Sequence, residues 1–208
     1  MERMLIEEAF REFAKLLEDR FHKGTFTTED SIRYTFFYCL SNYGNLHPSE
    51  IILEYPHPSI SNAKVDTYIP PKNNRFGLVF EFKFDRAIPS AKTAPRPQKA
   101  GKIFMDIMRL TLFPSHDKIR RYFVYVTDEE MASYFQNKHN QLNDFFNLMP
   151  QQTLRVDKAY INRHSMTFVK SVGTNIVPCE IMCLLSKEFQ RVMWLRVYEI
   201  KPIVVKGT

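Results

Sequence analysis

Two short segments with alternating apolar and polar residues, joined by a turn, constrain the fold of this chain more than any other feature of its sequence. The segments cover residues 64–69 and 78–84, and in the second every other residue is Leu or Phe. Successive side chains of a strand point to opposite faces, so this pattern is typical of β-strands. The intervening Pro-Pro-Lys-Asn-Asn favours a turn. We therefore expect a β-hairpin, with Glu81 and Lys83 on one face of its second strand and Asp66 on the polar side of its first.

The rest of the chain predicts an α/β fold with a central mixed β-sheet flanked by helices. Apolar residues at helical spacing indicate helices at about residues 1–22, 28–41, 97–112 and 128–146, the last with a break near Asn140. Apolar runs indicate further strands at 51–55, 122–127, 166–170, 176–185 and 192–205. We expect a single domain over residues 1–208. It has a core at about 28–128, a first helix packed on that core, and a C-terminal α+β extension at about 129–208 of unknown role.

The three cysteines and six histidines indicate neither a metal site nor a disulfide framework. Cys39 is isolated, Cys179 and Cys183 lie four residues apart in an apolar run, and no histidines are spaced as zinc ligands. We expect the cysteines to be small buried hydrophobic residues. The motifs GxxxxGK[ST], GxGxxG and GxSxG are absent, which argues against a nucleotide-binding loop and a serine-hydrolase nucleophile elbow.

The apolar runs are too short for a membrane span, which needs about 18 residues or more. The N-terminal residues alternate charged and apolar side chains, whereas a signal peptide has a continuous apolar stretch after a basic start. We therefore expect no membrane partner and a cytoplasmic location.

The positive charge of the chain is concentrated in its middle. Between Lys64 and Arg121 there are 13 Lys or Arg and 5 Asp or Glu, a net charge of +8, whereas the remaining residues together carry −2. A local excess of basic residues is expected of a surface that binds a polyanion. An ordinary solvated basic surface would give the same count.

Asp66, Glu81 and Lys83 are the residues of the hairpin that suit a chemical reaction. If the two strands pair, both acids converge near one point. Carboxylate oxygens suit a hard divalent cation, which polarises a phosphate and lowers the pKa of a bound water. A nearby ammonium group orients that water or stabilises the developing charge. The alternative is that Glu81 and Lys83 are solvated neighbours on the wet side of a half-buried strand, because such a pattern also arises by chance.

The arrangement of these residues resembles the PD-(D/E)xK nuclease superfamily, which has the restriction-endonuclease-like fold. The resemblance covers roughly residues 28–128. Val65-Asp66 corresponds to the first motif without its proline, and Glu81-Phe82-Lys83 corresponds to an intact second motif. The resemblance implies that Asp66, Glu81 and Lys83 are catalytic and that the two acids bind Mg²⁺ (or Mn²⁺).

The resemblance also suggests residues outside the hairpin. The family often adds an acidic metal ligand from the helix before the sheet, which here indicates Glu29; the alternative is a helix-start charge that favours the helix dipole. Polar residues on the helix after the hairpin contact the scissile phosphate or support the metal site in this family. Gln98 and Lys102 lie on one side of that helix, and Asp106 and Arg109 continue that side and can pair with each other. The alternative for this side is a solvent-facing stripe.

The sequence therefore predicts a metal-dependent nuclease that hydrolyses phosphodiester bonds, with DNA favoured over RNA and a restriction or defence role by analogy. Family members commonly dimerise, so a homodimer is expected. We expect the nucleic acid to be guided by basic and polar residues of the loop and helix after the hairpin: Arg86, Arg96, Gln98, Lys99 and Lys102. Two other functions remain open. One is a non-catalytic nucleic-acid-binding or scaffolding subunit of a larger complex, and the other is a protein-interaction domain.

Overall fold

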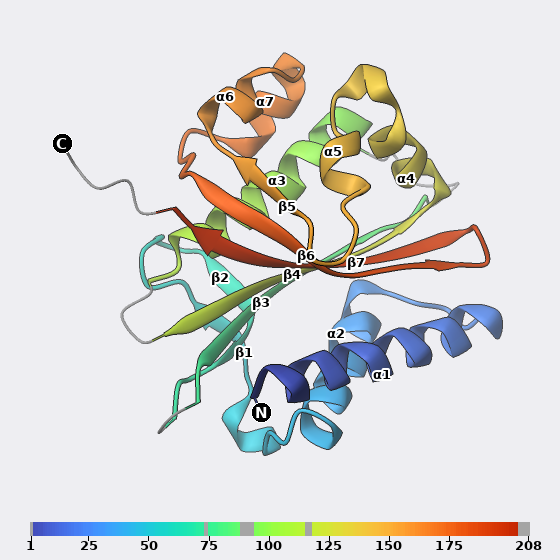
Figure 1. Ribbon diagram of the computed structural model, residues 1–208, viewed down its shortest axis with the longest axis vertical. Helices are drawn as coiled ribbons and strands as arrows, with labels where there is room; N and C mark the ends of the chain where they lie inside the picture. The colour runs from blue at the N-terminus through green and yellow to red at the C-terminus, as the bar shows by residue number, and fades with distance from the viewer. Residues whose placement is uncertain (1, 73–74, 88–93, 115–117, 204–208) are drawn as a thin grey trace.

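The computed structural model describes residues 2–72, 75–87, 94–114 and 118–203. Its centre is a seven-stranded sheet in the order β1-β2-β3-β4-β7-β6-β5 (Figure 1). Only β3 and β4 run parallel; the other neighbours are antiparallel. The strands are β1 (Ile52–Pro56), β2 (Lys64–Ile69), β3 (Gly77–Asp85), β4 (Ile119–Asp128), β5 (Thr153–Val156), β6 (Cys179–Phe189) and β7 (Met193–Pro202).

Helices cover both faces of the sheet, so the expectation of an α/β fold with a mixed, helix-flanked sheet is confirmed. Helices α1 (Glu2–His22) and α2 (Glu29–Asn42) lie on one face. The opposite face carries α3 (Arg96–Leu112), α4 (Glu129–Gln136), α5 (Asn143–Phe146), α6 (Lys158–Asn162) and α7 (Met166–Val172) (Figure 1). Short 3₁₀ turns occur at η1 (Pro48–Glu50) and η2 (Lys138–Asn140). Within the described part of the chain, no helix has the length and apolar character needed to cross a membrane.

Each face of the sheet has its own aromatic core. Under α1 and α2, the rings of Phe10 and Phe36 stack at 5.1 Å, and Phe36 meets Phe80 of β3 at 5.1 Å. On the other face, Phe104 of α3 and Phe145 of α5 lie 4.9 Å apart. The three cysteines are buried and free, as expected.

Strand β3 contributes to both cores, because its alternate residues face opposite layers. Phe80 and Phe82 pack under α1 and α2, whereas Val79 belongs to the core under α3. Glu81 is only 3% exposed. The alternative of a wet strand face is therefore wrong at Glu81, because α3 covers this part of the sheet.

The region predicted as a C-terminal extension supplies three strands of the same sheet. β7 pairs along most of β4, from Asp128 opposite Met193 to Arg121 opposite Ile200. The strand predicted at 166–170 is wrong: this segment is helix α7, which Ser165 caps by accepting the backbone N–H of Phe168 at 3.4 Å. The helix predicted at 128–146 divides into α4 and α5, with η2 between them at the expected break.

Candidate active site

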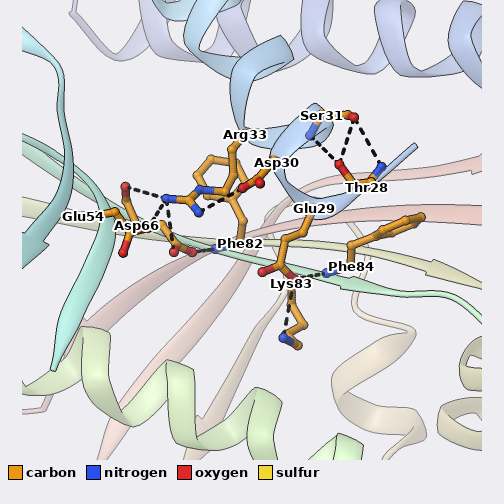
Figure 2. Close-up of polar contacts among 10 residues, drawn as sticks. All are labelled: Thr28, Glu29, Asp30, Ser31, Arg33, Glu54, Asp66, Phe82, Lys83 and Phe84. Carbon is orange, nitrogen blue, oxygen red and sulfur yellow. Dashed lines mark hydrogen bonds and ion pairs between the residues drawn. The ribbon is translucent and has the colours of Figure 1, made fainter. Parts of the chain in front are cut away.

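The candidate site lies where β2 separates from β3. Their ladder ends at Thr67 opposite Phe80, although β3 continues beside β4 as far as Asp85. Beyond the ladder, two N–H groups of β3 are bound by carboxylates instead of by a strand. Phe82 donates to Asp66 Oδ2 at 2.7 Å and Phe84 donates to Glu29 Oε2 at 2.9 Å (Figure 2). Because backbone donors need partners, these two acids are held at the free edge of β3.

Asp66 and Glu81 form an interacting pair of acids at this edge. Burial, and then the charge of Asp66, raise the pKa of Glu81 well above its ordinary value; Arg109 lowers it only in part. Burial also raises the pKa of Asp66, although the N–H of Phe82, the charge of Arg33 and a hydrogen bond with Glu81 oppose that rise. Two neighbouring carboxyl groups that resist ionisation together are a favourable place for a cation.

Helix α3 adds a third acid and an arginine to the pair. Arg109 Nη1 lies 3.0 Å from Glu81 Oε1, and its Nη2 lies 3.2 Å from Asp106 Oδ1. Burial raises the pKa of Asp106 to about 6, against the opposing charges of Arg109 and Lys83. The expected pairing of Asp106 with Arg109 is confirmed. Asp106 was not predicted as a site residue, although the polar stripe of this helix was the signal that includes it.

Lys83 pairs with Glu29, whereas Arg109 pairs with Glu81 and Asp106. The Nζ of Lys83 is 3.4 Å from Glu29 Oε2, and it projects toward α3 (Figure 2). Burial opposes its charge, but Glu29, Asp106 and Asp85 outweigh burial and raise the pKa of Lys83 above its ordinary value. Lys83 is therefore a protonated cation at neutral pH.

Glu29 reaches the site because it is the first residue of α2, directly after the capping residue Thr28. Thr28 caps the helix by accepting the N–H of Ser31 at 3.1 Å, and the Ser31 hydroxyl accepts the N–H of Thr28 (Figure 2). Glu29 then occupies the first helical turn and binds both Lys83 and the Phe84 N–H. The helix-start charge expected as one alternative is present, and the metal-ligand alternative stays a prediction.

The residues expected to guide nucleic acid lie around the start of α3 and the end of β3. Lys102 is exposed, Gln98 is half-buried, and neither makes a hydrogen bond or ion pair with Asp66, Glu81 or Lys83 in the described residues. Burial raises the pKa of Asp85, and the nearby charges of Lys83 and Lys99 oppose part of that rise. Arg96 pairs with Glu130 at 2.9 Å, and the exposed Arg86 lines a shallow pocket with Phe84 and Asp128.

The basic middle of the chain is partly neutralised by its own acids. Arg75 and Lys72 both bind Glu50, at 3.2 and 3.1 Å. Arg121 is 4% exposed, and it donates to the carbonyl oxygen of Phe113 at 2.8 Å. The count of charges along the sequence therefore overstates the positive surface of the folded protein.

The acids offer only oxygen ligands, which suit Mg²⁺ or Mn²⁺ better than zinc. No group of three or more His, Cys, Asp or Glu suited to holding a metal ion occurs among the described residues. Mg²⁺ is usually bound by one or two carboxylates together with waters and substrate phosphates, so two acids such as Asp66 and Glu81 would be enough to hold it. Glu29 already binds Lys83 and the Phe84 N–H, which suits a role through water better than direct ligation.

Comparisons of the chain with protein-family models, with curated proteins and with solved structures found no match. The functional interpretation of the site therefore depends on its geometry and chemistry.

Proposed function

We propose that the protein is a magnesium- or manganese-dependent nuclease of the PD-(D/E)xK type, with Asp66, Glu81 and Lys83 as its catalytic residues. One observation carries the proposal: the carboxyl groups of Asp66 and Glu81 interact at the end of the β2–β3 ladder. If the two acids had only a structural role, we would expect neighbouring basic side chains to neutralise their charges fully. Here the pKa of both acids remains raised despite Arg33 and Arg109, which favours a cation as the third component.

In this proposal, Asp66 and Glu81 hold the metal, with Glu29 contributing through water. Bound Mg²⁺ supplies Lewis acidity and a water of lowered pKa. Lys83 keeps its proton, because three acids raise its pKa, so it orients the water and stabilises developing negative charge rather than removing a proton. Arg109 and Asp106 hold Glu81 in place from α3.

The proposed substrate is DNA, in preference to RNA, and the proposed assembly is a homodimer that cuts both strands. Lys99, Lys102, Arg86 and Arg96 lie along the end of β3 and the start of α3 and would contact the phosphate backbone. Such contacts give an affinity that depends on salt and little on sequence. A restriction or defence role is compatible with this chemistry, but a fold does not by itself fix a pathway.

The test is cleavage of supercoiled plasmid, linear duplex, single-stranded DNA and RNA in Mg²⁺, Mn²⁺ or EDTA. Asp66→Asn, Glu81→Gln and Lys83→Ala should each abolish a metal-dependent activity. Glu50→Gln is a matched control, because Glu50 is also a carboxylate bound by an arginine but lies outside the site.

Cleavage that survives Asp66→Asn or Glu81→Gln, in protein with an unchanged unfolding transition, would contradict the assignment. Equal activity in EDTA would exclude the metal-dependent mechanism.

A second candidate function is a non-catalytic nucleic-acid-binding or scaffolding subunit. The observation in its favour is that Asp66 and Glu29 already bind two N–H groups of β3, so both have a structural use. Binding of DNA that is equal with Mg²⁺ and with EDTA, without any cleavage, would support this candidate over the nuclease.

A further inference from the structure

Glu54 has an unusual backbone conformation in the strand beside Asp66. Its φ is +53°, in the left-handed region that residues with a Cβ rarely adopt. The residues on either side pair normally with β2, Leu53 with Thr67 and Tyr55 with Val65. The strain is therefore confined to Glu54, and such strain persists only where the surroundings enforce it.

The conformation of Glu54 brings its side chain to Arg33 of α2. The two side chains form a close ion pair, and Arg33 also lies 3.6 Å from Asp66 Oδ1 and 3.4 Å from Asp30 Oδ1 (Figure 2). Arg33 further donates to the backbone oxygen of Asp66 at 3.3 Å. One guanidinium group thus joins the first proposed metal ligand to two acids outside the site.

The two arginines of the site differ in the exposure of their partners. The acid partners of Arg109 are buried, with side chains 3% and 11% exposed. The outer partners of Arg33 are open to solvent, at 49% for Glu54 and 68% for Asp30. Arg33 itself is 15% exposed, whereas these two acids return to water when they are released. Another anion that reaches the guanidinium group can therefore replace them at small cost to the acids. The partners of Arg109 cannot be replaced in this way, because they would be left buried and unpaired.

We propose that Arg33 binds a phosphate of the substrate. In the free protein the Glu54 carboxylate pairs with the same guanidinium group, and the substrate phosphate displaces it on binding. The inference rests on the proposed nuclease function and extends it to the α2 side of the site. A guanidinium group can bind phosphate through two parallel hydrogen bonds, the same geometry that it uses with a carboxylate. When the phosphate displaces Glu54, the ion pair with Arg33 that accompanies the positive φ of Glu54 is lost, so the backbone of Glu54 can relax.

The test measures binding of a fluorescein-labelled DNA oligonucleotide by anisotropy in Mg²⁺, in the Lys83→Ala background, where both metal-binding acids remain and cleavage is prevented. The variants are Arg33→Gln, Arg33→Lys, Glu54→Gln, Glu54→Gly and the Arg33→Gln/Glu54→Gln double variant. Glu50→Gln is the matched control, since it removes an acid from another arginine pair. Thermal unfolding of each variant checks its fold.

Arg33→Gln should weaken binding by about tenfold and lower the slope of log Kd against log salt by about one, as loss of one phosphate contact requires. Arg33→Lys should recover part of the loss. Glu54→Gln and Glu54→Gly should tighten binding severalfold with the slope unchanged, and Glu50→Gln should have no effect. In the Arg33→Gln background, Glu54→Gln should no longer matter, because Glu54 acts through Arg33.

Metal-dependent binding that Asp66→Asn removes, but that the Arg33 and Glu54 variants leave unchanged, would overturn this inference and retain the nuclease. The same holds if Glu54→Gln tightens binding equally with and without Arg33. If Arg33→Gln does not fold, Glu54→Gln and Glu54→Gly decide the question. Absence of metal-dependent binding in every protein would overturn the proposed function and this inference with it.

Discussion

At the scale of single residues, the site is governed by the cost of burying carboxyl groups. Glu81 is buried on the α3 side of β3, and its nearest charges are two acids and one arginine. Burial favours the neutral acid, and the charge of Asp66 favours it further. The folded protein therefore disfavours the charged form of Glu81 more than water does, although Arg109 offsets part of this effect.

Glu81→Gln should therefore change the free energy of unfolding of the metal-free protein at pH 7 by less than about 1 kcal/mol, because Gln removes a charge that burial disfavours and keeps an oxygen that can accept from Arg109. Saturating Mg²⁺ should stabilise the original protein, by about 2.7 kcal/mol at one hundred times the Kd, and should not stabilise the variant. Thermal unfolding with and without Mg²⁺ measures both effects. An unchanged Mg²⁺ shift in the variant would remove Glu81 from the metal site.

His57 makes the stability of the protein depend on pH, because it is a buried base whose hydrogen bonds need the neutral ring. It is 5% exposed; its Nε2 donates to the carbonyl oxygen of Arg109 at 2.9 Å, and its Nδ1 accepts the N–H of Ser59 at 3.1 Å. The second bond requires an unprotonated Nδ1. Burial lowers the pKa of His57, so the unfolded chain binds a proton at a higher pH than the folded protein does.

The contribution of His57 to the free energy of unfolding is therefore complete above pH 6.5. It is lost progressively as the pH falls from there through the lowered pKa of His57 in the folded protein. His57→Gln keeps a donor for Arg109 but cannot titrate. Urea unfolding should show that the variant is less stable at pH 7.5 and that this deficit shrinks by pH 5.5. A deficit that is constant or grows on acidification would contradict the assignment. His164, whose pKa burial also lowers, leaves some pH dependence in both proteins.

At the scale of elements, the site depends on how closely α3 and α2 approach the sheet. α3 carries Asp106 and Arg109, and α7 packs directly against α3. A Cβ added at Gly101 would lie 2.5 Å from the carbonyl oxygen of Phe168 and 2.6 Å from Ser171 Cβ. The glycine therefore permits close packing of α3 against α7.

Gly101→Ala should lower the free energy of unfolding by about 1–3 kcal/mol, since overpacking outweighs the gain of about 1 kcal/mol in helix propensity. Urea unfolding measures the change. Adding Ser171→Gly should restore only part of it, because the carbonyl oxygen of Phe168 remains. A variant more stable than the original protein would show that the two helices can separate without cost.

The start of α2 depends on the hydroxyl group of Thr28. Thr28→Ala should lower the free energy of unfolding by about 1 kcal/mol, because the N–H of Ser31 loses its acceptor. Thr28→Ser keeps that acceptor and should lose much less. Urea unfolding of both variants makes the comparison, and equal losses would assign the effect to the threonine methyl group rather than to the cap.

At the scale of the whole molecule, the sheet joins distant parts of the sequence. β4 lies between β3, which carries Glu81, and β7, from the end of the chain. Ile200 of β7 belongs to the same core as Phe104 of α3. The layer that holds Asp106 and Arg109 is thus completed by residues well beyond the region of family resemblance.

A chain that ends at residue 150 lacks β5, β6 and β7 and leaves the edge of β4 unpaired. It should show no cooperative urea transition and should lack near-ultraviolet circular dichroism, because both cores lose residues of β6 and β7. A cooperative transition with native-like near-ultraviolet signal would instead establish an independently folding core.

Local periodicity determined much of this structure from the sequence alone. The β2–β3 hairpin, α1, α2 and α3 follow from runs long enough to distinguish a period of two from a period of 3.6. The shared face of Glu81 and Lys83 follows from the same rule. Periodicity failed at residues 166–170, because a segment of only five residues does not distinguish a strand from a helix. The structure shows a helix here, packed closely against α3.

Only the tertiary structure decided which charged groups meet. The end of the β2–β3 ladder, the approach of Asp106 to Glu81, the strained contact of Glu54 with Arg33 and the pairing of Arg75 with Glu50 all join separate elements. A sequence pattern records the direction of each side chain along its own helix or strand. Which distant group it contacts depends on the packing of whole elements, and that packing is fixed by the buried area and backbone pairing of the complete sheet.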